Sequence, residues 1–184
     1  MIGEEFAAVL AAAQDGSEAA FSVLWRDANP ALLRYLRVVA PDAAEDVAAE
    51  TWVQVIRGVS GFRGDERAWR SWLFTTARRR VIDEGRRLSR HPVASLAELS
   101  GDREPRTEDA AALAMENLGT VAAIAAISAL PPLQAEVILL RVLAGLDTEA
   151  VARIVGRNPG AVRVAAHRGL RRLAQVLATE GVTL

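Results

Sequence analysis

The last fifty residues of the chain constrain its fold more than any other segment, because they contain the boundaries of a helix-turn-helix in sequence order. Leu130-Pro131-Pro132 ends one apolar helix and begins the next, since proline is accepted in the first turn of a helix but not in its interior. Asp147 is positioned to cap a short helix. After the turn Gly156-Arg157-Asn158, Asn158 is predicted to cap the final helix, with Pro159 at its first position.

The predicted final helix has one apolar face and one basic face. Its apolar face contains Val162, Ala166, Leu170, Leu173 and Leu177. Its basic face contains Arg163, His167, Arg168, Arg171 and Arg172. A helix of this kind can place its N-terminal turn in a DNA major groove and its arginines along the phosphates. The segment therefore predicts DNA binding.

The formal net charge of −1 conceals two basic blocks. Residues 63–90 contain nine arginines and four acidic residues, and residues 141–172 contain seven arginines and two acidic residues. Residues 1–50 and 98–116 are acidic. A single basic block is usually a solvated helix face, but two blocks on separate helical units indicate contact with nucleic acid.

Composition favours an all-α protein without bound cofactors. Alanine, leucine, valine and arginine are abundant and strand-type alternation is absent. The chain has no cysteine and only two histidines, which excludes disulfides and thiolate or histidine-rich metal sites. Carboxylate metal sites stay open, but no motif supports one, so we expect no metal and no cofactor. No apolar run reaches the roughly eighteen residues of a membrane span, and the N-terminus is acidic, so we expect a cytoplasmic protein without membrane insertion.

The pattern along the chain predicts two small helical domains, at residues 1–91 and 118–184, joined by a flexible acidic linker at residues 92–117. In the first domain, Ser17 is expected to cap a helix that is interrupted near Asn29-Pro30, and Asp65 to open a long helix. Prolines, a glycine, serines and mixed charge without periodicity indicate the linker. An alanine-rich helix is expected from Thr107 to Leu130.

Three segments resemble the extracytoplasmic-function (ECF) RNA polymerase sigma factors. DAAEDVAAETW at residues 42–52 resembles the clamp-binding helix of that family, and RAWRSWLFTTARRRVID at residues 67–83 resembles its promoter-melting helix. The C-terminal helix-turn-helix is similar to the third conserved segment. The three occur in the family's order and cover roughly residues 18–90 and 118–178. The resemblance implies a sigma-2-like helical bundle and a sigma-4-like helix-turn-helix domain.

The resemblance also implies partners and site residues. Core RNA polymerase would be bound by Glu45, Asp46, Glu50, Trp52, Gln54 and Arg57. The −10 promoter element would be held and melted by Phe62, Arg63, Arg78, Arg79, Arg80, Asp83, Arg86, Arg87 and Arg90. The −35 element would be read by Asn158, Gly160, Ala161, Arg163, Val164, His167, Arg168 and Arg171. An anti-sigma protein is a further partner implied by the family.

Within the promoter-melting helix, Trp69, Trp72 and Leu73 are expected to form buried core, whereas Arg78, Arg79 and Arg80 cannot all face inward. No phosphate loop, nucleophile motif or metalloprotease motif is present, so we expect no enzymatic activity. A magnesium nuclease is conceivable, but the sequence contains no motif that supports it.

Two alternatives to a sigma factor stay open. One is a DNA-binding regulator, in which only the C-terminal domain touches DNA. The other is an adaptor with the same fold that binds polymerase without opening DNA.

Overall fold

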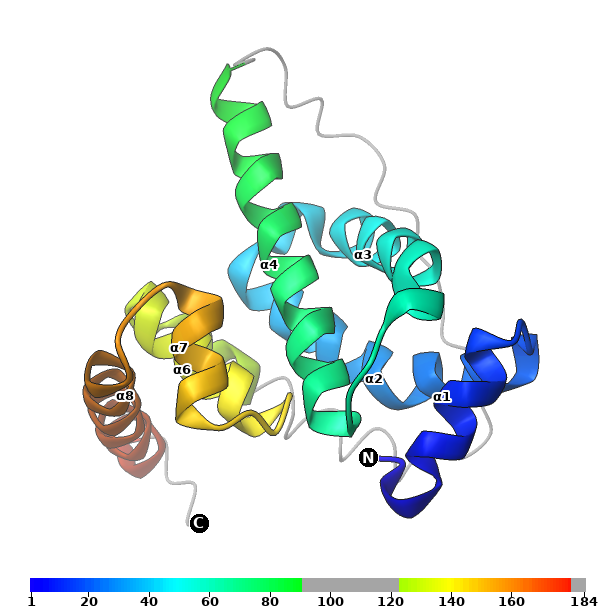
Figure 1. Cartoon of the computed structure of the whole chain (residues 1–184). Helices are drawn as coiled ribbons and strands as arrows, with labels where there is room; N and C mark the ends of the chain where they lie inside the picture. Colours follow the sequence, from blue (N-terminus) through cyan, green and yellow to red (C-terminus); the bar gives the residue numbers. More distant parts are fainter. Residues whose placement is uncertain (91–122, 180–184) are drawn as a thin grey trace, which may run out of the picture.

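The structure is a computed structural model and describes residues 1–90 and 123–179. Within these ranges every regular element is a helix (Figure 1). The α-helices are α1 (Phe6–Gln14), α2 (Glu18–Val39), α3 (Ala44–Gly58), α4 (Glu66–Arg90), α6 (Pro132–Val142), α7 (Thr148–Val155) and α8 (Pro159–Thr179). Short 3₁₀ turns occupy Gly3–Glu5, Pro41–Ala43 and Val59–Gly61. The predicted all-α fold with two helical units is confirmed.

Part of the predicted organisation lies outside the described residues. The linker at 92–117 and most of the helix expected from Thr107 belong to this part. Of that expected helix residues 123–130 are described, and 123–128 are helical. Among the helices of the described ranges, none is both long and apolar enough to cross a membrane.

Local capping explains where several helices begin. The Ser17 hydroxyl accepts a hydrogen bond from the Ala20 amide at 3.2 Å, and the Asp65 carboxylate accepts one from Ala68 at 2.8 Å. Each side chain satisfies one of the free N–H groups of a helix's first turn. Both helix starts predicted from the sequence are therefore confirmed.

The predicted interruption at Asn29-Pro30 is wrong, because α2 continues through Pro30. A proline inside a helix typically costs about 3 kcal/mol. Here the helix is packed on both sides of the proline, with Leu24, Ala28 and Leu32 completely buried. Burial of an apolar side chain contributes about 1.5–3 kcal/mol, so packing outweighs the local preference for a break.

The core of the N-terminal unit is built around aromatic side chains. Trp69 and Leu73 are buried as predicted, and the Tyr35 ring meets Phe74 edge-on at 5.4 Å between centroids. Trp72 is only half-buried. Its ring stacks on Phe62 at 5.2 Å and 19°, so the loop before α4 is joined to the face of that helix.

The C-terminal unit packs α6, α7 and α8 around Val137, Val151 and Val162. Leu170, expected on the apolar face of the last helix, is instead 56% exposed. α8 approaches α6 closely at the neighbouring Gly169, where a Cβ atom would lie 2.6 Å from Ile138 Cδ1. Because successive residues of a helix are about 100° apart, this contact turns Leu170 away from α6.

The two units are packed against each other. α6 lies beside α2, and α7 lies beside α4 (Figure 1). Buried residues of both units belong to one continuous cluster, and Val38 of α2 contacts the group formed by Leu130, Ala135 and Ile138. The two predicted domains therefore share an apolar boundary.

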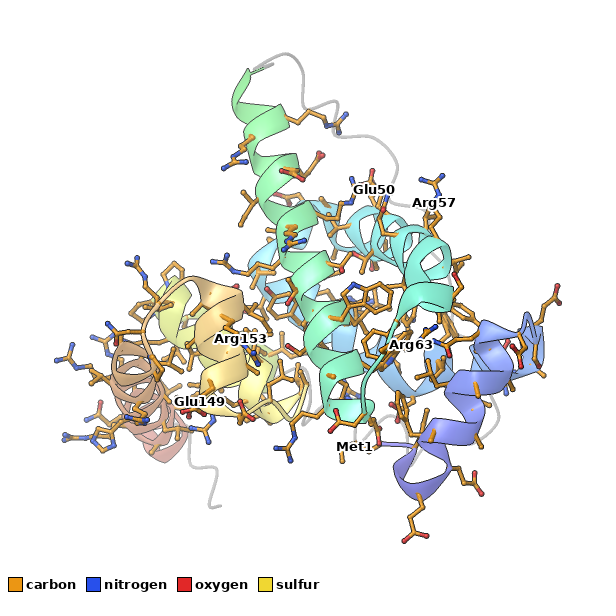
Figure 2. The ribbon with its side chains drawn as sticks, in the orientation of Figure 1. Met1, Glu50, Arg57, Arg63, Glu149 and Arg153 are labelled. Atoms are coloured by element: carbon orange, nitrogen blue, oxygen red, sulfur yellow. The ribbon has the colours of Figure 1, made fainter. Side chains whose placement is uncertain are left out.

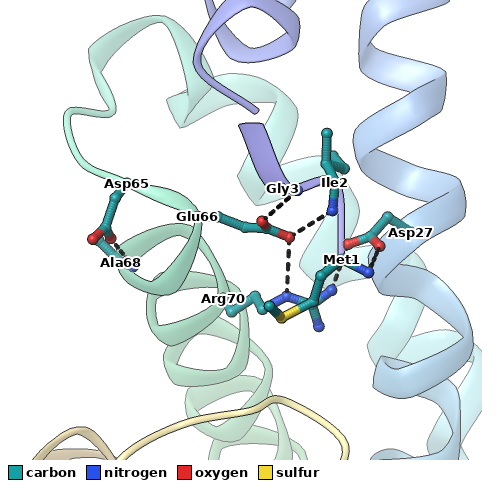
Figure 3. A network of polar contacts seen from close by, with 8 residues as sticks. All are labelled: Met1, Ile2, Gly3, Asp27, Asp65, Glu66, Ala68 and Arg70. Carbon is teal, nitrogen blue, oxygen red and sulfur yellow. Dashed lines mark hydrogen bonds and ion pairs between the residues drawn. The ribbon is translucent and has the colours of Figure 1, made fainter. Parts of the chain in front are cut away.

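A buried polar network ties the beginning of the chain to α2 and α4 (Figure 3). The Arg70 guanidinium pairs with Asp27 and lies 3.6 Å from Glu66. Glu66 accepts hydrogen bonds from the amides of Ile2 and Gly3, both at 2.9 Å. Arg70 thus neutralises two mostly buried carboxylates.

Candidate nucleic-acid interface

The exposed side of α3 is acidic. Glu45, Asp46 and Glu50 are all exposed on this helix, and Figure 2 shows Glu50 and Arg57 along its length. Glu45 pairs with Arg37 of α2 at 3.3 Å. Arg57 is exposed and Gln54 is half-buried at the other end of the helix. The first turn of α3 therefore presents carboxylates that a basic partner could reach.

Trp52 does not share this surface. It is only 6% exposed, and its indole N–H donates to the Asn29 side chain at 2.9 Å. Its ring also packs edge-on against Phe21 at 6.0 Å. Packing between α2 and α3 accounts for this tryptophan, so the structure leaves it out of the acidic contact surface.

Acidic α3 residues and basic α4 residues meet in one cleft. Glu50 lies 3.7 Å from Arg80, and Glu84 accepts two hydrogen bonds from Arg87 at 2.8 and 2.9 Å. The hydrogen bond from Arg87 lowers the pKa of the Glu84 carboxyl. The charged residues lining the cleft are Asp46, Glu50, Arg80, Asp83, Glu84 and Arg87. From the sequence, Asp46 and Glu50 were assigned to polymerase, Arg80, Asp83 and Arg87 to the −10 element, and Glu84 to neither; the structure places all six in one cleft.

A second cleft between α3 and α4 has a cationic and aromatic lining. Its residues are Gln54, Arg57, Gly58, Trp72, Thr76, Arg79, Arg80 and Asp83. Arginines near an aromatic face form the type of surface on which unstacked bases and phosphates bind. Trp72 and Thr76 were absent from the predicted site. Their spacing could have revealed them, because residues 72, 76 and 79 share one face of a helix.

The loop that precedes α4 is held in place at several points. Gln14 donates to the carbonyls of Val59 and Phe62 at 2.9 and 2.7 Å. The exposed Arg63 folds back onto the carbonyls of Ser60 and Phe62 at 2.9 and 2.7 Å. The predicted residue Phe62 therefore supports the second cleft through its stacked ring, while Arg63 stays at the surface.

The three consecutive arginines of α4 point in three directions. Arg79 is exposed, Arg80 faces Glu50, and Arg78 turns towards the C-terminal unit. The Arg78 Nε atom lies 2.7 Å from a carboxylate oxygen of Glu136 on α6. Further along α4, Arg86 lies 3.7 Å from Asp83, and Arg90 is the last residue of the helix.

The C-terminal unit forms the predicted helix-turn-helix. Asp147 caps α7 by accepting from Ala150 at 2.8 Å, and Gly156 closes it with a φ of 67°, a conformation that favours glycine. The side-chain oxygen of Asn158 accepts from Ala161 at 2.7 Å and caps α8. Exposed along α8 are Gly160, Arg163, Val164, His167, Arg168 and Arg171, with Ala161 half-buried.

Two family models match the chain, one to each unit. Sigma-70 region 2 matches residues 24–91, and Sigma-70 region 4 matches residues 120–173. The chain is 31% identical over 191 residues to the ECF RNA polymerase sigma factor SigD of Mycobacterium tuberculosis, covering 98% of this chain and 88% of SigD. The chain belongs to the ECF RNA polymerase sigma factors. It is therefore an alternative sigma factor that directs transcription initiation.

A second relative and a solved structure are also similar to this ECF sigma factor. It is 31% identical over 169 residues to the ECF sigma factor BldN of Streptomyces coelicolor, covering 90% of this chain and 63% of BldN. Its fold matches RpoE of Bartonella quintana, crystallised with the anti-sigma factor NepR, with a TM-score of 0.62 and 22% identity. That match covers 86% of this chain and 96% of RpoE.

The cap on α8 yields a prediction for the sigma factor. We expect Asn158→Ala to lower the free energy of unfolding by about 1 kcal/mol, because the Ala161 amide loses its acceptor. Asn158→Ser keeps a capping oxygen and should be nearly neutral. Chemical denaturation of the two variants measures the difference. If Asn158→Ala and Asn158→Ser were both as stable as the unmodified protein, the cap would contribute nothing to stability. A loss of promoter binding in both variants would then reflect a DNA contact of Asn158.

Proposed function

We propose that this ECF sigma factor uses three separate surfaces in initiation. The exposed acidic turn of α3 binds core RNA polymerase, the cationic cleft between α3 and α4 holds the −10 element, and the exposed face of α8 reads the −35 element. The observation that carries the proposal is that each helical unit has its own basic, exposed helix surface. The unit boundaries 1–91 and 118–184 belong to the same proposal.

Arg57, which the sequence assigned to polymerase, lines a cleft with Trp72 and Arg79 that is suited to an opened DNA strand. Unstacking a base costs a few kcal/mol, and stacking on an aromatic ring contributes about 1–3 kcal/mol per base. The half-buried Trp72 ring and the neighbouring guanidiniums can together offset the cost of opening. Because such a site binds the single strand better than the duplex, it shifts the population towards melted DNA. Arg86, Arg87 and Arg90 would follow the backbone upstream.

The exposed face of α8 separates base reading from phosphate binding. Arg163 lies in the second turn of the helix, close to its N-terminus, and one turn of helix separates it from His167. N-terminal residues of a recognition helix contact base edges, whereas more distal arginines reach phosphates. Glu149 of α7 lies 3.7 Å from Arg163 and can orient its guanidinium. Figure 2 shows Glu149 and Arg153 on α7 beside this helix.

This assignment predicts different effects for two arginines of α8. Arg163→Ala should cost about 1–3 kcal/mol on the preferred −35 sequence and relax discrimination at one position. Arg168→Ala should weaken all sequences about equally and reduce the salt dependence of binding by about one counterion. Binding of the holoenzyme to a library of −35 variants measures both. Equal loss across the library for Arg163→Ala would refute the base contact.

The remaining parts of the proposed function concern partners and location. We propose that an anti-sigma protein regulates the factor, that the factor catalyses no reaction itself, and that it works in the cytoplasm where polymerase and promoter DNA are found. Catalysis then belongs to the polymerase, and no metal or cofactor is needed for the factor's own task.

Run-off transcription with core polymerase tests the proposed function. Transcripts from a promoter library should appear only when the sigma factor is added, and their start sites should share upstream elements. Absence of transcripts, together with tight and specific binding of the protein alone to duplex DNA, would favour the regulator. Binding to polymerase without any opening of DNA would favour the adaptor.

A further inference from the structure

One acidic side chain of the C-terminal unit reaches a predicted DNA contact of the N-terminal unit. Glu136 of α6 accepts hydrogen bonds from Arg78 Nε at 2.7 Å and from the Tyr35 hydroxyl at 3.0 Å. The Glu136 side chain is 14% exposed and the Arg78 side chain 25% exposed. Charge-assisted hydrogen bonds are about twice as strong as neutral ones, and more so away from water.

The third group in this contact, the Tyr35 hydroxyl, stays protonated and donates to Glu136. Burial raises the pKa of Tyr35 well above its usual value, and the nearby Glu136 carboxylate raises it further. The hydroxyl therefore keeps its proton at neutral pH. A second ion pair between the units joins Arg67 to Asp147 at 3.6 Å. Both of its side chains are exposed, so it contributes little. In the described residues, the Glu136 contact is thus the strongest polar link between the units.

While the two units are packed together, they cannot span the distance between the −35 and −10 elements of a promoter. The −35 and −10 elements are named for positions about 25 base pairs apart, which corresponds to about 85 Å of straight duplex at about 3.4 Å per base pair. A compact chain of this length has a radius of gyration of about 16 Å and hence a diameter of about 40 Å. The two units must therefore separate before one molecule can contact both elements.

We infer that Glu136 is a latch that holds the two units together and keeps Arg78 from DNA. The inference rests on the proposed function for the role of Arg78. A carboxylate and a phosphate compete for the donors of a guanidinium. Glu136 holds the Nε donor of Arg78 and the Val155 carbonyl lies 3.5 Å from its Nη2 atom, so a −10 phosphate can take both donors only after the C-terminal unit has moved away. The basic face of α8 is exposed in the packed state, so the latch withholds Arg78 from the −10 element while the −35 surface stays accessible.

The chain allows a direct measurement of this latch, because it contains no cysteine. Spin labels at Ser60→Cys and Ala174→Cys would place one probe on an exposed position of each unit. In the otherwise unchanged protein, a single narrow and short distance distribution is expected. Glu136→Gln should raise the ratio of long to short distances about tenfold, as expected for loss of a charged hydrogen-bonded pair.

Two further variants make the result specific. Tyr35→Phe removes the second donor to Glu136 while keeping the ring that packs on Phe74, and should open the units to a smaller extent. Glu149→Gln is the matched control, because Glu149 pairs with Arg163 inside the C-terminal unit and should leave the distances unchanged. Helical circular dichroism identifies any variant that has failed to fold, and such a variant is replaced by Glu136→Ala.

The outcomes separate the latch from the proposed function. Unchanged distances in folded Glu136→Gln and Tyr35→Phe would overturn the latch, as would equal opening by Glu149→Gln. In the holoenzyme the role of Arg78 is tested directly. Arg78→Ala should make the salt dependence of binding to −10 single strand shallower by about one counterion, and an unchanged slope would overturn the role of Arg78. Run-off transcription by the unmodified protein tests the proposed function independently of the distances.

Discussion

Replacing Asp46 and Glu50 together by alanine is expected to reduce promoter-dependent transcription by about 30-fold or more. Truncating one partner of a charged interface pair costs about 2–5 kcal/mol, and 1.4 kcal/mol corresponds to a factor of ten. Both side chains are exposed, so the change should leave the fold intact. Run-off transcription and direct binding to core polymerase measure the effect.

A matched control and a single variant identify the cause of the loss of transcription in the double variant. Glu4→Ala/Glu5→Ala removes the same charge from exposed residues at the other end of the unit and should leave transcription unchanged. Because Glu50 lies 3.7 Å from Arg80, the Asp46→Ala variant separates polymerase binding from effects on that arginine. Wild-type affinity of the double variant for core polymerase would remove α3 from the polymerase contact.

Removing the Arg70 guanidinium should cause the largest loss of stability among single substitutions in the polar network of Figure 3. Arg70→Ala is expected to lower the free energy of unfolding by about 3 kcal/mol, because the mostly buried Glu66 would lose its cation and Asp27 would keep only the Met1 ammonium, 2.6 Å away. For a chain of this size the loss corresponds to a fall in Tm of about 10 °C. Chemical and thermal denaturation measure it.

Arg67→Ala provides the comparison on the same helix. The Arg67 side chain is 67% exposed and its partner Asp147 is 3.6 Å away, so the loss should be below about 1 kcal/mol. The Arg70 side chain, by contrast, is 6% exposed. Similar losses for the two variants would show that burial does not decide the strength of these pairs.

The start of α8, the closure of α7 and the basic face of the recognition helix follow from the sequence. Asn158 contacts an amide three residues away, and Gly156 adopts its left-handed conformation within a single turn. Such features depend on neighbours along the chain, so residue type and spacing are sufficient to predict them. For the same reason the sequence already placed the −35 candidates on one exposed face.

Only the tertiary structure decided the positions that depend on residues far apart in the chain. Pro30 stays within α2 because packing supports the helix, and Trp52 is buried against Phe21 and Asn29. Arg78 meets Glu136 across 58 residues of sequence. Helical periodicity shows which side chains share a face, but which element covers that face depends on how the helices pack. That is why three neighbouring arginines with the same predicted role ended in three different environments.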